Sequence, residues 1–279
     1  TLVQAPLKSA TLNPIWQRRA LAQNWRWPGW FRVLQWSGMG ILLLQISVPF
    51  SSLFFLTDSW VGFSQNIRSA SSEIGFTLGV STLTALLSLP LAYALALQLQ
   101  QKRQWGWWLL VTLPLAIPAP LIGIGLISLW NRAFLSQIYA SFWMPVLAAL
   151  ARFVPIAAII ITVQMRRVKP QLIEAAEILQ PHRWRKTLWI HIPLIGPGLL
   201  TAALMTFILT LGELGATLLV VPAGKSTLTI RIYNFLHYGA SQTVASLCLG
   251  ITLLVLLFAS AATLIMVAWS RRTSQTQTL

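Results

Sequence analysis

Residues 141–163 read SFWMPVLAALARFVPIAAIIITV, an apolar run of 23 residues in which Arg152 is the only charged side chain. A helix needs roughly 20 predominantly apolar residues to cross the hydrocarbon core of a bilayer, so this run is long enough to span it. Five further segments have the same character, and we expect six spans at about 36–56, 73–97, 106–130, 141–163, 198–221 and 243–269. The sequence therefore predicts an all-α protein, a polytopic transmembrane helical bundle.

The composition points to the same class. Hydrophobic residues make up 56% of the chain and charged residues only 9%, proportions that a water-soluble domain of 279 residues could not bury. The net charge of +15 comes from Lys and Arg in short clusters between the apolar runs, whereas a nucleic-acid binder gathers them on one folded face. We expect membrane lipid, and no nucleic acid, as a partner.

The basic residues also predict an orientation. If the N-terminus is cytoplasmic, fifteen of the 20 Lys and Arg residues fall in inner segments and four in outer ones, with Arg152 inside a span. Short cytoplasmic loops carry an excess of Lys and Arg, so both termini and the loop at 165–197 are expected in the cytoplasm.

Two spans carry residues that disturb a regular helix. The run from Pro114 to Pro120 contains three prolines and is expected to bend or break the span at 106–130. Gly123 and Gly125 follow it, and small residues of this kind fit a close helix contact or the wall of a pathway.

The loop at 165–197 contains a polar stretch that predicts two short helices. Pro170 begins the first helix, Glu174 and Glu177 suit its positive end, and Pro181 stops it. The second helix follows and ends near Pro193. Two short helices at an angle form a compact knob, which suits contact with a partner better than it suits chemistry.

The spacing in this stretch resembles the EAA loop of binding-protein-dependent, type I ABC importer permeases. Glu174-Ala175-Ala176 is followed, after the expected interval, by Ile190-x-Ile192-Pro193. In that family the loop is the cytoplasmic coupling helix, so the resemblance implies docking on ABC ATPase subunits through Glu174, Ala175, Ala176, Gln180, Arg183 and Arg185. Gln180 stands where the family has glycine, so the turn must form without a residue that freely takes positive φ.

The residues themselves do not suggest an enzyme. The chain has five carboxylates and three histidines, which are scattered along the sequence, and no Gly-rich phosphate loop of the Walker type. We expect no catalytic residue, no metal site and no cofactor in this chain, with ATP and Mg on a partner subunit.

Two ionisable residues are expected deep in the membrane. Glu213 lies in the predicted span at 198–221, and Arg152 is the only basic residue placed equally deep. A charge in the bilayer core must face protein or water, so we expect an ion pair between them. This pair could fix the helix register, or it could line or gate the substrate path.

The outer segment from Pro222 to Gly239 is mildly amphipathic, and it could rest on lipid or contact a soluble partner. The stretches 212–217, 222–225 and 230–234 resemble ferric iron importer permeases, in which this region faces the binding protein. The resemblance implies that Lys225, Arg231, Tyr233 and Asn234 contact an extracytoplasmic substrate-binding protein. Those permeases are often two fused halves, and residues 1–35 look like the linker before the second half.

These observations predict a permease subunit, or half, of an ABC importer in the bacterial inner membrane. We expect residues 1–35 to be a cytoplasmic or interfacial segment or a linker, 36–272 to be the six-helix transmembrane domain, and 273–279 to be a cytoplasmic tail. A second permease half or copy would complete the path. We expect ferric iron as the cargo, with thiamine, polyamine or an inorganic anion as alternatives, and an ion-coupled secondary transporter as the rival class.

Overall fold

The computed structural model describes residues 28–57, 59–101, 105–132, 136–168, 171, 185 and 187–275. All the regular elements in these ranges are helices, which confirms the predicted all-α class. The chain divides into two units, Thr1–Ser52 and Leu53–Leu279.

The first unit contains most of α2 (Gly29–Leu56), an apolar helix of 28 residues with Pro49 inside it. The helix is long enough to cross a bilayer. It begins at Gly29, directly after Pro28, and not at the predicted residue 36. The predicted span marked only the stretch expected to cross hydrocarbon, and a helix can extend beyond that stretch.

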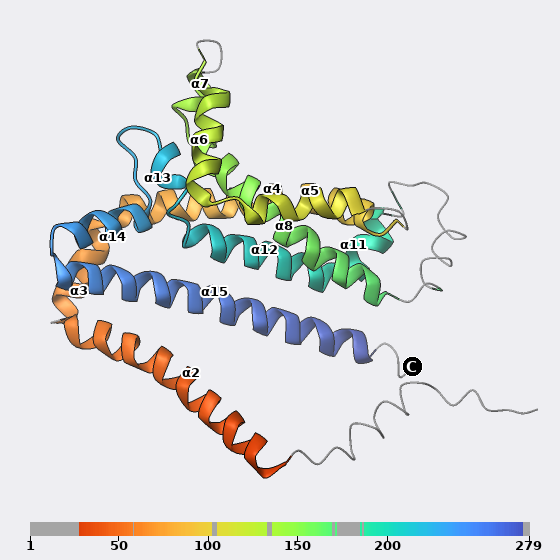
Figure 1. Ribbon diagram of the computed structural model, residues 1–279, viewed down its shortest axis with the longest axis horizontal. Coiled ribbons are helices and arrows are strands. Elements are labelled where there is room, and N and C mark those ends of the chain that lie inside the picture. The colour runs from red at the N-terminus through yellow and green to blue at the C-terminus, as the bar shows by residue number, and fades with distance from the viewer. Residues whose placement is uncertain are drawn as a thin grey trace, which may run out of the picture. The chain divides into compact units, whose positions relative to one another are not determined.

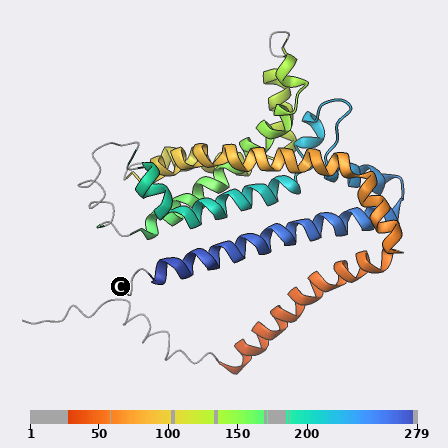
Figure 2. The ribbon, with the colours of Figure 1, turned by 180° about the vertical axis from the view of Figure 1, so that it is seen from behind.

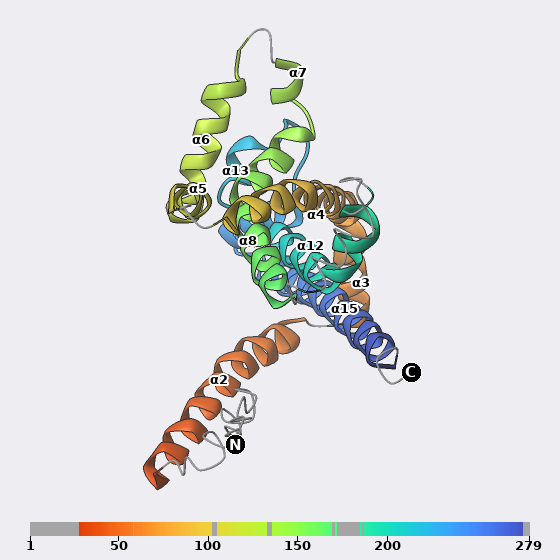
Figure 3. The same cartoon turned by 90° about the vertical axis from the view of Figure 1, so that its right-hand side faces the viewer.

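The second unit is built around α4 (Ser71–Leu99), α8 (Trp143–Arg167) and α12 (Gly196–Leu211), which pack on one another. Figures 1 and 2 show these helices running alongside α15 (Ser241–Gln275). Figure 3 shows the same four helices roughly along their axes. Small side chains allow close approach in its core, as at Ala96, Ala157 and Ala202, all fully buried.

Shorter helices complete the second unit. They are α3 (Trp60–Ser69), α5 (Trp105–Ala116), α6 (Ala119–Trp130), α7 (Ser136–Tyr139), the π-helix η2 (Thr187–His191), α11 (Ile192–Leu194), α13 (Thr217–Val220) and α14 (Leu228–His237). Side-chain caps begin two of them: Ser59 Oγ accepts a hydrogen bond from Gly62 N (3.1 Å), and Thr227 Oγ1 accepts one from Ile230 N (3.3 Å).

Two of the six predicted spans are not single straight helices. The four straight candidates are α2, α4, α8 and α15, and they match the predicted spans near 36–56, 73–97, 141–163 and 243–269. The span predicted at 106–130 is the pair α5 and α6, bent by 103° where Pro118 precedes α6. The bend that the three prolines predict is thus present, and α6 leaves the direction of α5 in Figure 1.

The span predicted at 198–221 differs more. Its helix begins earlier, with η2 and α11 bent by 71° against α12, and it ends at Leu211. Residues 212–216 are not helical, and α13 adds only four residues. The prediction of one continuous span to residue 221 was wrong, because hydropathy alone does not register the local polar contacts made by Glu213.

Candidate functional site

Glu213 occupies the connection between α12 and α13. The C-cap of α12 is Gly212, and the backbone N of Glu213 still donates to Thr210 O (3.1 Å). The residue is 5% exposed. Glu213 therefore lies just past the end of a helix and not in the middle of a span, where the sequence placed it.

Both oxygens of the Glu213 carboxylate have a partner. Oε2 forms an ion pair with Nη1 of Arg152 on α8, and Oε1 accepts a hydrogen bond from the backbone N of Ala216 (2.8 Å). The ion pair expected from the sequence is present in the structure. The role of the pair in transport stays a prediction.

The main-chain carbonyl of Glu213 joins two further elements to the same point. It accepts hydrogen bonds from Thr217 Oγ1 at the start of α13 (2.9 Å) and from Thr229 Oγ1 on α14 (2.9 Å). We call Arg152, Glu213, Ala216, Thr217 and Thr229 the Glu213 junction. Because four helices meet there, a movement of one of them changes the surroundings of a buried carboxylate.

Glycine makes close packing around the junction possible. A Cβ added at Gly215 would lie 2.7 Å from the Cβ of Ala119 at the start of α6. A Cβ at Gly123 would lie 3.2 Å from the carbonyl oxygen of Ala216 and 3.1 Å from Cδ1 of Leu219. Gly123 thus makes the close helix contact that the sequence predicts, whereas a Cβ added at Gly125 would meet no atom of the described residues within 4 Å.

A second ion pair joins α14 to α4. Arg231 Nη1 lies 2.6 Å from Glu73 Oε1 and also donates to the carbonyl oxygen of Ser69 (2.9 Å). Its Nη2 donates to Ser69 Oγ (3.0 Å). The sequence missed Glu73 as a partner. Its signal was weak: a single carboxylate at the start of a long apolar span, far along the chain from Arg231.

The residues expected to contact a binding protein lie on α14 and in the turn before it. Arg231 and Asn234 line an open groove of about 460 Å³ with Glu73, Ser226, Phe235 and Tyr238. Lys225 is exposed in the preceding turn, where Gly224 has φ 74°. Tyr233 is half-buried, and its ring packs against His237 at 4.4 Å between centroids.

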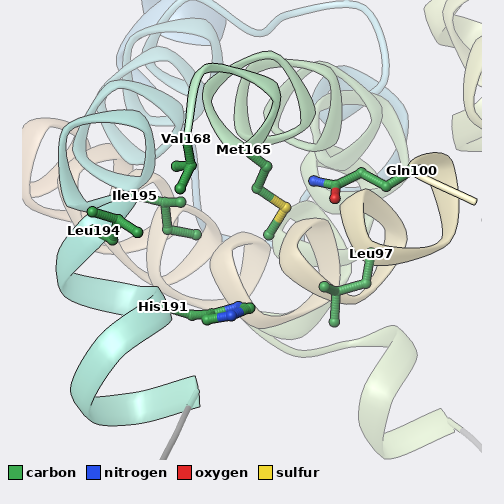
Figure 4. Close-up of a pocket in the computed structure, with 7 residues that line it drawn as sticks. All are labelled: Leu97, Gln100, Met165, Val168, His191, Leu194 and Ile195. Atoms are coloured by element: carbon green, nitrogen blue, oxygen red, sulfur yellow. The ribbon is translucent and has the colours of Figure 1, made fainter. Parts of the chain in front are cut away.

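The residues expected to couple to an ATPase lie mostly outside the described part of the chain. This holds for Glu174, Ala175, Ala176, Gln180 and Arg183, whereas Arg185 is described and exposed. The described flanks are the end of α8 and the start of η2. A cavity of about 40 Å³ lies between the C-terminal ends of α4 and α8 and the stretch from His191 to Ile195, and His191 and Gln100 point toward it in Figure 4.

Within the described residues, no group of three or more His, Cys, Asp or Glu side chains is placed to hold a metal ion.

Comparison with known proteins places the chain in a family. Residues 88–275 match the family described as "Binding-protein-dependent transport system inner membrane component", and this match runs from α4 to the end of α15. It includes the whole Glu213 junction.

Three relatives illustrate the range of the family. The sulfate transport system permease protein of Escherichia coli is 30% identical over 164 residues, which cover 53% of this chain and 58% of that protein. A putative 2-aminoethylphosphonate permease protein of Salmonella typhimurium is 29% identical over 148 residues, covering 52% and 54%. The molybdenum permease protein of Haemophilus influenzae is 29% identical over 203 residues, covering 67% and 89%. The match thus spans little more than half the length of the first two relatives.

Solved structures share the fold. A bacterial alginate ABC transporter, in complex with an alginate-bound periplasmic protein, superposes with a TM-score of 0.63 at 18% identity, covering 88% of this chain and 95% of that chain. The methionine ABC transporter in inward-facing conformations gives 0.60 at 15% identity, covering 71% and 94%. The helical bundle, its spans and the family match agree: this multi-pass chain belongs to the binding-protein-dependent transport system inner membrane components.

Proposed function

We propose that the chain is a permease subunit of an ABC importer, forming part of a translocation path that a separate ATPase drives. The observation that carries this proposal is the family match over residues 88–275, which includes the packed helices α8, α12 and α15 and both flanks of the predicted coupling loop. A second permease half or copy and an extracytoplasmic binding protein complete the proposed assembly.

The connectivity suggests how a push on the loop would be transmitted. The segment at 174–193 is preceded by α8, which carries Arg152, and followed by α12, which leads directly to Glu213. A force applied by an ATPase would therefore act on α8, which carries Arg152, and on α12, whose C-terminal end leads into the Glu213 junction. Rocking of packed helices against each other is a common way to alternate access to a central path.

For the cargo, we propose a small oxyanion in preference to ferric iron. The relatives described above are named for sulfate, molybdenum and 2-aminoethylphosphonate transport; two of these names favour the inorganic-anion alternative, and the phosphonate group of the third is also an oxyanion. Ferric iron is supported by the resemblance in 212–217, 222–225 and 230–234. One uptake experiment can distinguish an oxyanion cargo from ferric iron.

The test is uptake by the native host after deletion of the gene. We expect the deletion to abolish ATP-dependent uptake of radiolabelled sulfate, molybdate or 2-aminoethylphosphonate, while ferric citrate uptake is unchanged, and we expect the restored gene to recover it. Loss of ferric citrate uptake alone would assign iron as the cargo. Uptake that survives ATP depletion but collapses with a protonophore would support the ion-coupled rival.

Coupling can be tested in the same strain. Ala175→Asp is expected to leave membrane abundance unchanged and to abolish uptake, because a charged side chain would not fit a groove that receives a small residue. Wild-type uptake by this variant would contradict the coupling role.

The groove on α14 is proposed as part of the binding-protein contact. Asn234 is exposed there and Lys225 is exposed beside it, so replacing both by Ala removes contacts from the surface without disturbing the core. We expect a raised KM for uptake with unchanged abundance. Gln242→Ala, an exposed change at the start of α15, is the matched control.

A further inference from the structure

Arg152 lies within the apolar helix α8, yet part of its charged side chain is exposed. It follows Trp143, the first residue of α8, by nine positions, or ~14 Å along a helix that is ~37 Å long. The side chain is 27% exposed, whereas that of Glu213 is 4% exposed. A charged surface facing hydrocarbon at this depth is costly, so the exposed edge of Arg152 must face water or another protein chain.

The guanidinium keeps hydrogen-bonding capacity at that edge. Arginine carries five N–H donors, and the bond from Nη1 to Glu213 Oε2 is the hydrogen bond that the described residues give this side chain. Each side-chain nitrogen of Arg152 either has a hydrogen-bond partner or keeps accessible surface. The Arg152 nitrogens that make no hydrogen bond to the described residues therefore keep some accessible surface.

A planar fork of N–H donors matches the oxygens of a tetrahedral oxyanion. An isolated arginine in a low-dielectric path would hold such an anion too tightly for it to leave. Glu213 offsets that charge, and its own two oxygens are already satisfied by Arg152 and Ala216. The pair is thus close to neutral overall while its exposed edge presents donors only, which suits a site that binds and releases.

We infer that the exposed edge of the Arg152 guanidinium is a transient binding site for the oxyanion cargo, and that Glu213 limits its affinity. This inference rests on the proposed function and names the residue that would contact the cargo. A pair that only fixes helix register would not require accessible donors.

The test restores a positive charge chemically. In the full chain with its partner subunits, Arg152→Cys is combined with Glu213→Gln, so that no buried carboxylate is left unpaired, and with Cys248→Ala, so that one thiol remains. Membrane vesicles are treated with the cationic reagent 2-aminoethyl methanethiosulfonate or with the neutral methyl methanethiosulfonate. ATP-dependent uptake of radiolabelled sulfate and molybdate is then measured.

Without reagent, uptake per molecule is expected to fall about tenfold, as for the loss of a charge-assisted hydrogen bond. The cationic adduct is expected to recover uptake at limiting anion concentration and the neutral adduct none, while the maximal rate stays below wild type because Glu213 is absent and no longer limits the affinity. The control is Ala151→Cys with Cys248→Ala, an exposed neighbour about 100° away around the helix, where neither reagent should alter uptake.

Three results would overturn the inference: equal recovery with both reagents, no mass shift from labelling at position 152, or wild-type uptake by the untreated variant. If the triple variant does not accumulate, Arg152→Gln with Glu213→Gln carries the test, and wild-type uptake per molecule again overturns it. Vesicles with the wild-type chain that take up neither of these anions nor 2-aminoethylphosphonate would overturn the proposed cargo itself, which keeps the two failures distinct.

Discussion

The two Arg–Glu ion pairs of the second unit differ in which side chain has the more complete set of hydrogen bonds. In the pair of Arg152 and Glu213, the carboxylate is enclosed with both oxygens partnered, and the arginine keeps an exposed edge. In the pair of Arg231 and Glu73, the arginine donates to Glu73 and twice to Ser69, while Glu73 Oε2 has no partner among the described residues.

The difference shows which member of each pair is structural. Glu213 cannot lose Arg152 without becoming a buried, uncompensated charge, and such losses are large. Glu73 lies near the start of α4 and keeps about a fifth of its side chain exposed, so solvent screens its charge more than that of Glu213. The inner arginine is therefore free to meet a ligand, whereas the outer arginine mainly attaches α14 to α4.

Replacing each arginine by methionine should separate the two ion pairs most clearly. Arg152→Met is expected to destabilise the protein by about 3–5 kcal/mol, because Glu213 stays buried without its cation. The matched change Arg231→Met is expected to lose about 1 kcal/mol. Unfolding of the purified proteins in mixed micelles measures both. Equal losses would show that the two pairs are equivalent.

Removing both members of each pair sharpens the contrast. In a double-mutant cycle with Arg152→Met and Glu213→Leu, we expect a coupling energy of about 2–3 kcal/mol, since the second change removes the unpaired charge left by the first. The cycle with Arg231→Met and Glu73→Leu is expected to give about 0.5 kcal/mol. Additive losses at the inner pair would contradict this account.

Packing beside the inner pair gives the next effect. Gly215→Ala is expected to lose about 1–3 kcal/mol, because its Cβ would meet the Cβ of Ala119 at 2.7 Å and both atoms are fixed close to the backbone. Gly125→Ala, with no neighbour within 4 Å, is expected to gain up to about 1 kcal/mol of helix stability. The same unfolding assay compares them.

The hydrogen bond from Thr229 to Glu213 links the two ion pairs, and we expect its loss to have a small effect. Thr229 lies on α14, two residues before Arg231, and its hydroxyl donates to the carbonyl oxygen of Glu213. Thr229→Val is expected to cost about 1 kcal/mol. The control is Thr252→Val, whose hydroxyl bonds only within α15 and should cost about 0.5 kcal/mol or less. A Thr229 loss no greater than this control would separate the two pairs.

Part of the site was accessible from the sequence. The pairing of Arg152 with Glu213 follows by elimination, because no other basic residue lies as deep in an apolar run. The pairing of Glu73 with Arg231 did not follow, because each residue lies near the polar end of a segment, where water is an equally good partner. Their sequence separation of 158 residues gave no local signal.

Apolar length and proline act locally along the chain, so the order of the residues is enough to predict the class of protein, the approximate place of the spans and the bend before Pro118. The end of α12 at Leu211 and the meeting of four helices at Glu213 could be seen only in the folded structure. Hydropathy sums neighbouring residues, whereas the hydrogen bonds of a buried carboxylate come from residues that the fold brings together.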